Sequence, residues 1–146
     1  MASTIILAKL DSLHRCLARV ESKTPASLNV LESDLDIQDI ITLNLTRAVQ
    51  ICVDIATHII ADFNTPPPTS MAESFDRLKQ LQIISEETSV RLKKAVGFRN
   101  VSIHEYQNID WLIVYKIITE HLQDFKEFAR QVYAWPGRTQ GSALDT

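Results

Sequence analysis

Residues 36–61 read DIQDIITLNLTRAVQICVDIATHIIA, and this segment decides the fold. Its apolar residues recur at intervals of three and four, as they do on one wide face of an α-helix. That face comprises Ile37, Ile40, Ile41, Leu45, Ala48, Cys52, Ile55, Ala56 and Ile59. Asp36 is predicted to cap the helix, and Asp39 to lie in its first turn, where a negative charge interacts favourably with the helix dipole. The sequence therefore predicts a long helix that ends near Ala61.

A second row of side chains lies beside this apolar face. Its members follow one another at intervals of three or four and so share a helical face. They are Leu43, Arg47, Gln50, Asp54 and His58. Two interpretations are open: a solvated polar face, or a seam in which Arg47, Gln50 and Asp54 face a partner chain or an active cleft.

Helical spacing also fills the chain on both sides of the central segment. Apolar residues predict a helix over residues 4–21, followed by a loop over residues 22–33. The three prolines at 66–68 end the central helix, because proline cannot continue one. The sequence SMAE at 70–73 is a capping-box pattern, which predicts a short helix to about Leu81.

Two more helices complete the pattern. Ser85, followed by two glutamates, is predicted to begin a helix that runs into residues 97–106. Asn108 is predicted to cap the last helix, over residues 109–133. Five helices with short links indicate an all-α fold, an up-and-down bundle of four main helices with one additional short helix.

Length and composition fit one small domain. The chain has 146 residues and only three glycines, which favours helices over sheets. Residues 1–133 are expected to form the domain. Residues 134–146 hold a proline, two glycines and small polar residues, so they are expected to form a flexible tail.

Charge and cysteine content exclude several classes of function. The net charge of -3 argues against a general nucleic-acid binder, although it allows a local basic patch. Cys16 and Cys52 are far apart and lie in apolar helical patterns, so they are expected to be buried free thiols without metal or redox spacing. No signal peptide or membrane span is recognised, which favours a cytoplasmic protein.

The segment GFRNVSIHEY at 97–106 holds the most versatile chemistry in the chain. It supplies a permanent cation in Arg99, an amide in Asn100, an imidazole in His104 and a phenol in Tyr106. On a straight helix Arg99 and His104 would point roughly 140° apart, whereas residues four apart share a face. The four groups are expected to converge at a helix end, where the long arginine side chain can reach round.

A basic run precedes this segment. Arg91, Lys93, Lys94 and Arg99 bring four positive charges into nine residues with no acid among them. A solvated helix face is one explanation. A surface that binds RNA phosphates, through Arg91, Lys93 and Lys94, is the other.

Arginine and histidine together suffice for RNA cleavage without a metal. Arg99 can bind phosphate and stabilise charge on phosphorus, and His104 can move a proton as general acid or base. No clustered carboxylates or paired histidines suggest a metal site, and no cofactor is expected. An Arg and a His at this spacing arise by chance about one time in five, but the added Tyr106 lowers that chance to roughly 0.5%.

The segment RNVSIHEY at 99–106 resembles the R-x4-H-x-Y signature of HepT toxins, which belong to the HEPN superfamily of helical ribonucleases. The resemblance extends over residues 5–133. It includes LNLTR at 43–47, DIATHI at 54–59 and AVGFRN at 95–100.

The resemblance implies a homodimer whose two motifs meet in a cleft between subunits. It implies a toxin that cleaves cellular tRNA or mRNA without metal, with Arg99 and His104 as catalytic residues and Asn100 in support. It also implies an MNT-type nucleotidyltransferase antitoxin that transfers AMP to Tyr106. Two alternatives stay open: a non-catalytic helical module that presents RNA or another substrate to such a partner, and a dimeric scaffold whose motif only ends a helix.

Overall fold

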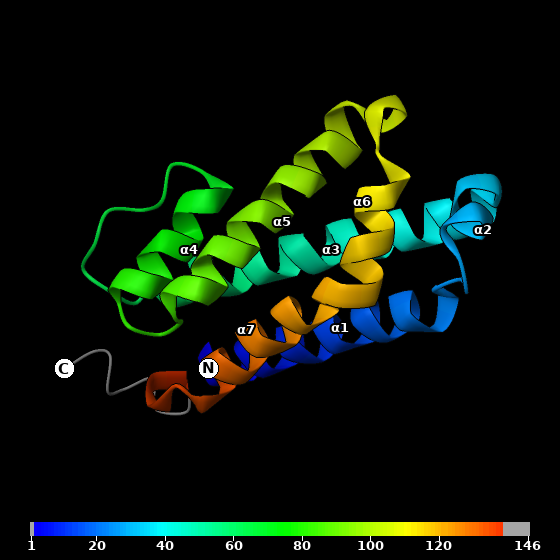
Figure 1. The fold of residues 1–146 in the computed structure, drawn as a ribbon. Helices are drawn as coiled ribbons and strands as arrows, with labels where there is room; N and C mark the ends of the chain where they lie inside the picture. Colours follow the sequence, from blue (N-terminus) through cyan, green and yellow to red (C-terminus); the bar gives the residue numbers. More distant parts are fainter. Residues whose placement is uncertain (1, 139–146) are drawn as a thin grey trace.

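The computed structural model describes residues 2–138, and these are arranged as helices without strands (Figure 1). The side chains of Ala2, Ser3 and Arg138 lie outside the description. Four long helical segments form the bundle: α1 (Ala2–Lys23), α3 (Leu35–Ile60), α5 (Glu86–His104), and a last segment made of α6 (Trp111–Lys116), the π-helical turn η2 (Ile117–His121) and α7 (Leu122–Ala134). Two short helices, α2 (Leu28–Ser33) and α4 (Met71–Gln80), and two 3-10 turns, η1 (Tyr106–Asn108) and η3 (Pro136–Arg138), complete it. The predicted all-α bundle is confirmed.

Helix α3 forms the centre of the core. Its predicted apolar face is buried from Ile41 to Ile59, and α1 packs along it more extensively than any other described helix. The helix is long and apolar enough to cross a membrane by length and composition. Half of its side chains are instead buried among those of the other helices, so it is the core helix of the bundle.

The N-cap of α3 lies two residues before the predicted one. The Asp34 side chain accepts a hydrogen bond from the Ile37 amide at 3.1 Å, so Asp34 is the N-cap. Asp36 lies in the first turn, and Asp39 follows it. Both Asp34 and Asp36 are good capping residues, and the one that lies next to α2 is used. The predicted caps Ser70 and Ser85 are confirmed.

The last helix also begins later than predicted. Asp110, not Asn108, is its N-cap, because the Asp110 side chain accepts a hydrogen bond from the Leu112 amide at 3.0 Å. Asn108 belongs to η1 and donates to the Glu105 carboxylate instead. The helix is then widened at η2, where the π turn separates α6 from α7. Figure 1 shows α6 and α7 following different directions.

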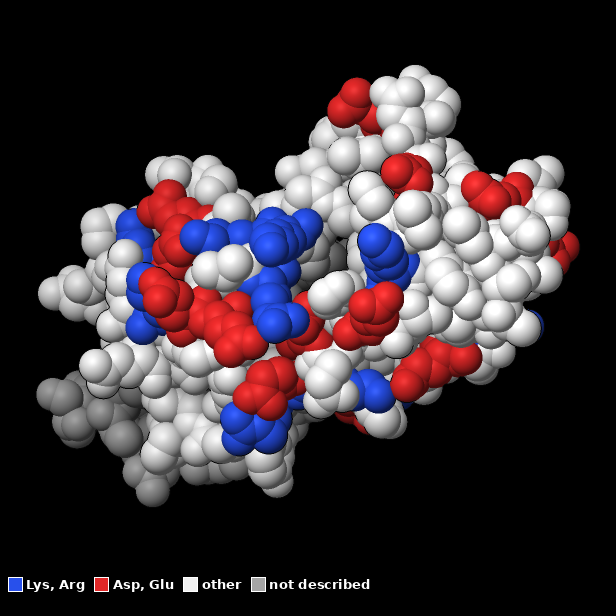
Figure 2. Space-filling view, in the orientation of Figure 1, with Lys and Arg blue, Asp and Glu red and all other residues white. Residues whose placement is uncertain are grey.

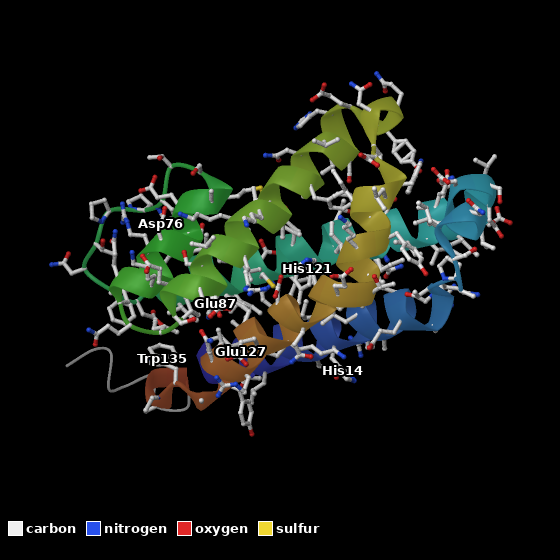
Figure 3. All side chains as sticks on the ribbon, viewed as in Figure 1. His14, Asp76, Glu87, His121, Glu127 and Trp135 are labelled. Atoms are coloured by element: carbon white, nitrogen blue, oxygen red, sulfur yellow. The ribbon has the colours of Figure 1, made fainter. Side chains whose placement is uncertain are left out.

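The packed part of the chain extends past the predicted boundary at residue 133. Trp135 is half-buried, and its ring lies 6.2 Å from that of Phe63, between centroids. Figure 3 shows Trp135 at the end of α7. Residues 139–146 of the predicted tail lie outside the described residues. Of the two free thiols, Cys52 is buried as predicted and Cys16 is half-buried.

Candidate active site

The predicted site segment lies at the end of α5 that projects from the bundle (Figure 1). Ser85 caps the start of this helix, and Glu86 and Glu87 occupy its first turn. The helix continues without interruption through Gly97 to His104. Asn100 and His104 are exposed and, being four residues apart, share a face.

No hydrogen bond joins the side chains of Arg99 and His104 among the described residues. They lie on different sides of a regular helix, roughly 140° apart. The Arg99 guanidinium donates to the Asn100 side-chain oxygen at 3.2 Å, and among the described residues no carboxylate pairs with it. An amide does not cancel the positive charge, so Arg99 remains free to bind an anion. His104 is exposed and ends the helix.

Tyr106 contacts a different helix from the one that carries Arg99 and His104. Its hydroxyl donates to the Asp39 carboxylate of α3 at 3.0 Å, and its ring packs edge-to-face on Trp111 at 6.2 Å. Burial raises the pKa of the Tyr106 phenol, the hydrogen bond and charge of Asp39 raise it further, and Thr42 lowers it. Within the described chain Arg99 is therefore bonded to Asn100, whereas Tyr106 is bonded to Asp39 of α3.

Asp39, Thr42 and Trp111 are site residues that the sequence did not reveal. Asp39 lies 67 residues before Tyr106, and a polar residue at the start of a helix is common. The only feature of the sequence that could have indicated this role was the charge of Asp39, which is explained equally well by a favourable interaction with the helix dipole.

Two of the four basic residues of the run on α5 are paired with acids, one acid from α5 itself and two from other helices. Arg91 pairs with Glu87 at 2.8 Å and with Asp124 of α7 at 3.1 Å, and these carboxylates raise the pKa of its guanidinium. Lys93 pairs with Asp76 of α4 at 2.9 Å. In Figure 2, Lys and Arg side chains gather beside a hollow, with Asp and Glu side chains next to them.

Two of the three residues predicted to bind RNA phosphates, Arg91 and Lys93, are therefore ion-paired in this chain, and their part in RNA binding stays a prediction. The pairing acids lie outside the segment 91–99 from which the patch was predicted. Glu87 precedes that segment by one helical turn, and the other two acids come from α4 and α7. Lys94 is exposed and has no ion pair among the described residues.

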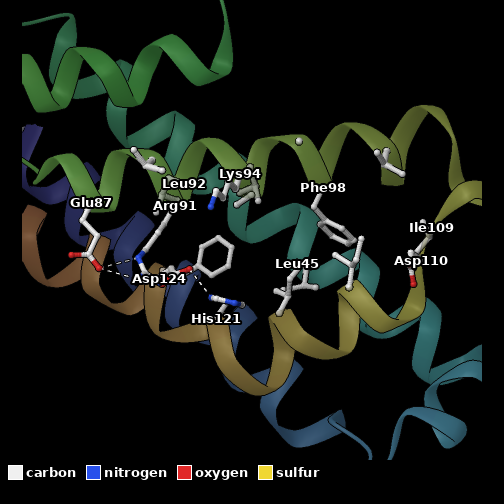
Figure 4. A pocket seen from close by; sticks show the side chains of 18 of the residues that line it. Leu45, Glu87, Arg91, Leu92, Lys94, Phe98, Ile109, Asp110, His121 and Asp124 are labelled. Carbon is white, nitrogen blue, oxygen red and sulfur yellow. Dashed lines mark hydrogen bonds and ion pairs between the residues drawn. The ribbon is translucent and has the colours of Figure 1, made fainter.

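An apolar groove of about 970 Å³ separates α5 from α6 and α7 (Figure 4). Apolar side chains from α3, α5, α6 and α7 line it, including Leu45, Phe98 and Ile113. Its polar end holds His121, whose ring lies 3.4 Å from the Asp124 carboxylate. Two large apolar side chains that line it are exposed, Val90 by 42% and Ile113 by 53%. Apolar side chains exposed beside a groove can mark a protein–protein interface.

The seam residues contact α1 and solvent. The Gln50 side chain donates to Asp54 at 2.9 Å, and Lys9 of α1 lies 3.9 Å from Asp54. Arg47 and Gln50 line a shallow pocket with residues of α1, and Arg47 is exposed. Asp54 and His58 are half-buried, and neither has a recorded bond to the motif.

The remaining histidines lie apart from the motif. Figure 3 places His14 on α1 and His121 at the junction of η2 and α7. Among residues 2–138, no group of three or more His, Cys, Asp or Glu side chains is arranged to hold a metal ion.

Comparisons with known proteins agree on one family. The family described as ribonuclease HepT-like matches residues 13–132. The chain is 36% identical to the mRNA nuclease HepT of Shewanella oneidensis over 124 residues, which cover 85% of this chain and 92% of the relative. It is 28% identical to the tRNA nuclease HepT of Aphanizomenon flos-aquae, over 90% of this chain and 89% of the relative.

Solved structures give the same result. The structure of a tri-AMPylated HEPN toxin of Shewanella oneidensis in complex with an MNT antitoxin superimposes with a TM-score of 0.84 at 34% identity. The match covers 90% of this chain and 98% of that one.

Proposed function

The chain belongs to the HepT-like ribonuclease family and is a ribonuclease, and on that premise we propose that it is the toxin of a toxin–antitoxin pair. It cleaves cellular RNA, tRNA or mRNA, in the cytoplasm without a catalytic metal. One observation carries the proposal: the triple of Arg99, His104 and Tyr106 stands at the projecting end of α5, with an arginine that no described carboxylate neutralises.

The proposed cleavage uses two groups of this segment. Arg99 binds the phosphate of the bond to be cut and stabilises the negative charge that develops on its oxygens. His104 takes the proton of the ribose 2'-hydroxyl or donates one to the leaving oxygen. Asn100, already bonded to Arg99, holds the guanidinium in place. Lys94 is the basic residue of the predicted run that is best placed to contact the RNA backbone.

We expect the active form to be a homodimer, because one chain presents Arg99 and His104 on different sides of α5. A second copy can bring its own His104 near the first Arg99. Two copies also supply two imidazoles, one to accept a proton and one to donate it. Three apolar side chains of α5 and α6 are exposed and would be covered by a second copy: Ile103, Leu112 and Ile113, of which Ile113 lines the groove.

The proposed partner is an MNT-type nucleotidyltransferase antitoxin that transfers AMP to Tyr106. The related Shewanella toxin is AMPylated in its complex with such an antitoxin. Tyr106 is 39% exposed, so its phenol can be reached. An added AMP phosphate would compete with RNA for Arg99 and block access to the site.

The first test is cleavage of bulk tRNA and mRNA by the purified chain in EDTA. Intact mass recorded on the same sample establishes that Tyr106 is unmodified. We expect equal cleavage with and without EDTA, because the proposed groups need no metal. An unmodified dimer that leaves both RNAs intact would instead favour a non-catalytic module that presents RNA to the nucleotidyltransferase.

Gly97 offers a test of the dimer. It lies inside α5, and a Cβ added there would meet nothing within 4 Å beyond its chain neighbours and the adjacent backbone of its own helix. Glycine costs about 0.5–1 kcal/mol in a helix interior relative to alanine, so the chain's own packing does not explain it. It shares a face with Asn100 and His104, three and seven residues on, where a second copy would approach closely.

We expect Gly97→Leu to give a stable monomer that neither dimerises nor cleaves RNA. Leucine favours the helix, so the melting temperature of the monomer should not fall. Sedimentation at several protein concentrations measures the dimer. Gln123→Leu, which places the same side chain on an exposed position of α7, is the matched control and should behave as wild type. A dimer of wild-type strength in Gly97→Leu would place the interface elsewhere.

A further inference from the structure

The Tyr106 hydroxyl meets two polar side chains of α3 that RNA cleavage does not use. Asp39 accepts its hydrogen bond at 3.0 Å. Thr42 lies three residues further along the same helix and therefore on the same side. The Thr42 hydroxyl lies beside the phenol, and Thr42 is only 7% exposed.

The Thr42 hydroxyl is an unsatisfied polar group. It is buried without a well-formed hydrogen bond among the described residues. Leaving such a group unpaired costs about 1–3 kcal/mol, so a buried hydroxyl of this kind usually has a use. Its position beside the phenol oxygen allows it to donate to that oxygen once the oxygen no longer carries a proton.

The phenol is held in place but remains accessible. Trp111 packs against the ring edge-to-face, and Asp39 accepts the hydrogen bond of the hydroxyl. Tyr106 is nevertheless 39% exposed to solvent. Tyr115 differs, because its hydroxyl donates to the backbone carbonyl of Ala26 at 3.1 Å. A carbonyl cannot take up the proton of a reacting phenol, whereas a carboxylate can.

We propose that Asp39 is the general base that prepares Tyr106 for nucleotidyl transfer, and that Thr42 positions the phenol oxygen. The inference rests on the proposed function in one respect, the role of Tyr106 as the acceptor. It adds that the toxin itself supplies the base, so the partner need provide only the nucleoside triphosphate and the groups that bind it.

The nucleotidyl group passes from a nucleoside triphosphate to the Tyr106 oxygen in one displacement at the α-phosphorus. The phenol oxygen forms a bond to the α-phosphorus as its proton passes to the Asp39 carboxylate. The bond between the α-phosphorus and the oxygen that bridges it to the β-phosphate breaks, and pyrophosphate leaves. Thr42 donates to the phenol oxygen, and Asp39 then releases its proton to water.

Asp39→Asn tests the base directly. Asparagine has nearly the same shape and can still accept the phenol hydrogen bond, but it cannot take up a proton. Purified chains are mixed with ATP, Mg²⁺ and the nucleotidyltransferase antitoxin of the Shewanella oneidensis complex, and adenylylation of Tyr106 is followed by peptide mass spectrometry. We expect the rate to fall by about 100-fold or more, within the usual range for loss of a general base.

Thr42→Val removes the hydroxyl and keeps the side-chain shape, and it should lower the rate to a smaller extent. Asp36→Asn is the matched control, since Asp36 is an exposed acid of the same helix with no recorded bond to Tyr106, and its rate should equal that of wild type. In Asp39→Asn the pKa of the Tyr106 phenol should also fall, because the carboxylate that helps to raise it is gone. NMR of labelled tyrosine measures that change.

A second reaction tests the reactivity of the Tyr106 phenol in the absence of the partner. An aryl sulfonyl fluoride transfers its sulfonyl group to the phenol oxygen and releases fluoride, while the proton passes to the base. Wild type should be labelled at Tyr106 near neutral pH, and Asp39→Asn much more slowly. Equal rates for the two chains in either reaction would overturn the role of Asp39.

AMP transfer and RNA cleavage are measured in separate assays. Wild-type chain that gains no AMP on Tyr106 would overturn the acceptor role and this proposal with it. RNA cleavage by unmodified wild type is judged in its own assay, and its absence would overturn the ribonuclease mechanism without affecting the labelling result.

Discussion

His104→Ala should abolish RNA cleavage while leaving the fold and the dimer intact. The side chain is exposed at the end of α5, so its removal opens no cavity. Loss of a positioned general acid or base typically lowers a rate by about 10²–10⁴-fold. If both copies in a dimer contribute an imidazole, the loss should lie at the upper end of that range. Initial rates of tRNA and mRNA cleavage in EDTA measure the effect.

His14→Ala is the matched control for this experiment. His14 is another exposed histidine, but it lies on α1, away from the motif (Figure 3). The His14→Ala variant should cleave RNA at the wild-type rate. Arg99→Lys adds a second comparison, since lysine keeps the charge and loses the forked donors that match phosphate. Undiminished cleavage by His104→Ala would remove the imidazole from the mechanism.

Phe128→Ala should cause a large loss of stability. The Phe128 ring of α7 is fully buried and packs edge-to-face on Phe75 of α4, with 5.8 Å between ring centroids. Truncation of such a phenylalanine usually costs about 3–5 kcal/mol in free energy of unfolding, because a cavity remains. A domain of this size has a total stability of roughly 7–20 kcal/mol, so the change removes a large share of it.

Urea unfolding followed by circular dichroism measures this loss, and thermal unfolding should show a drop of roughly 10 °C or more. Leu43→Ala is the control on α3, since Leu43 is 48% exposed and should cost under about 0.5 kcal/mol. A cost below about 1 kcal/mol for Phe128→Ala would mean that the contact between α4 and α7 contributes little to the bundle.

The elements that depend on residues close together in the chain could be predicted from the sequence. The apolar face of α3 and the caps at Ser70 and Ser85 depend on neighbouring residues, and they were predicted correctly. The caps predicted at Asp36 and Asn108 were wrong because another possible capping residue, an aspartate, lies two residues from each, and only packing against the rest of the chain decides which one is used. The π turn η2 left no recognisable pattern in the sequence.

The site was predictable in its residue types and not in its contacts. Arg99, His104 and Tyr106 stand out because they occur close together in the chain. The acids that neutralise Arg91 and Lys93 from α4 and α7 are distant in sequence, as is Asp39, which holds the phenol. The electrostatic character of a surface depends on every element that folds onto it, and a linear window contains only one of them.

The order of helices along the chain has a consequence for synthesis on the ribosome. The most apolar helix, α3, is translated before α4, α5 and α7, which later cover it. Domains form from the N-terminus as the chain emerges at about 5–20 residues per second, and exposed apolar surface invites aggregation during that interval. Its most extensive neighbour is α1, which is made first. We therefore expect a nascent hairpin of α1 and α3 to shield the future core until the remaining helices leave the exit tunnel.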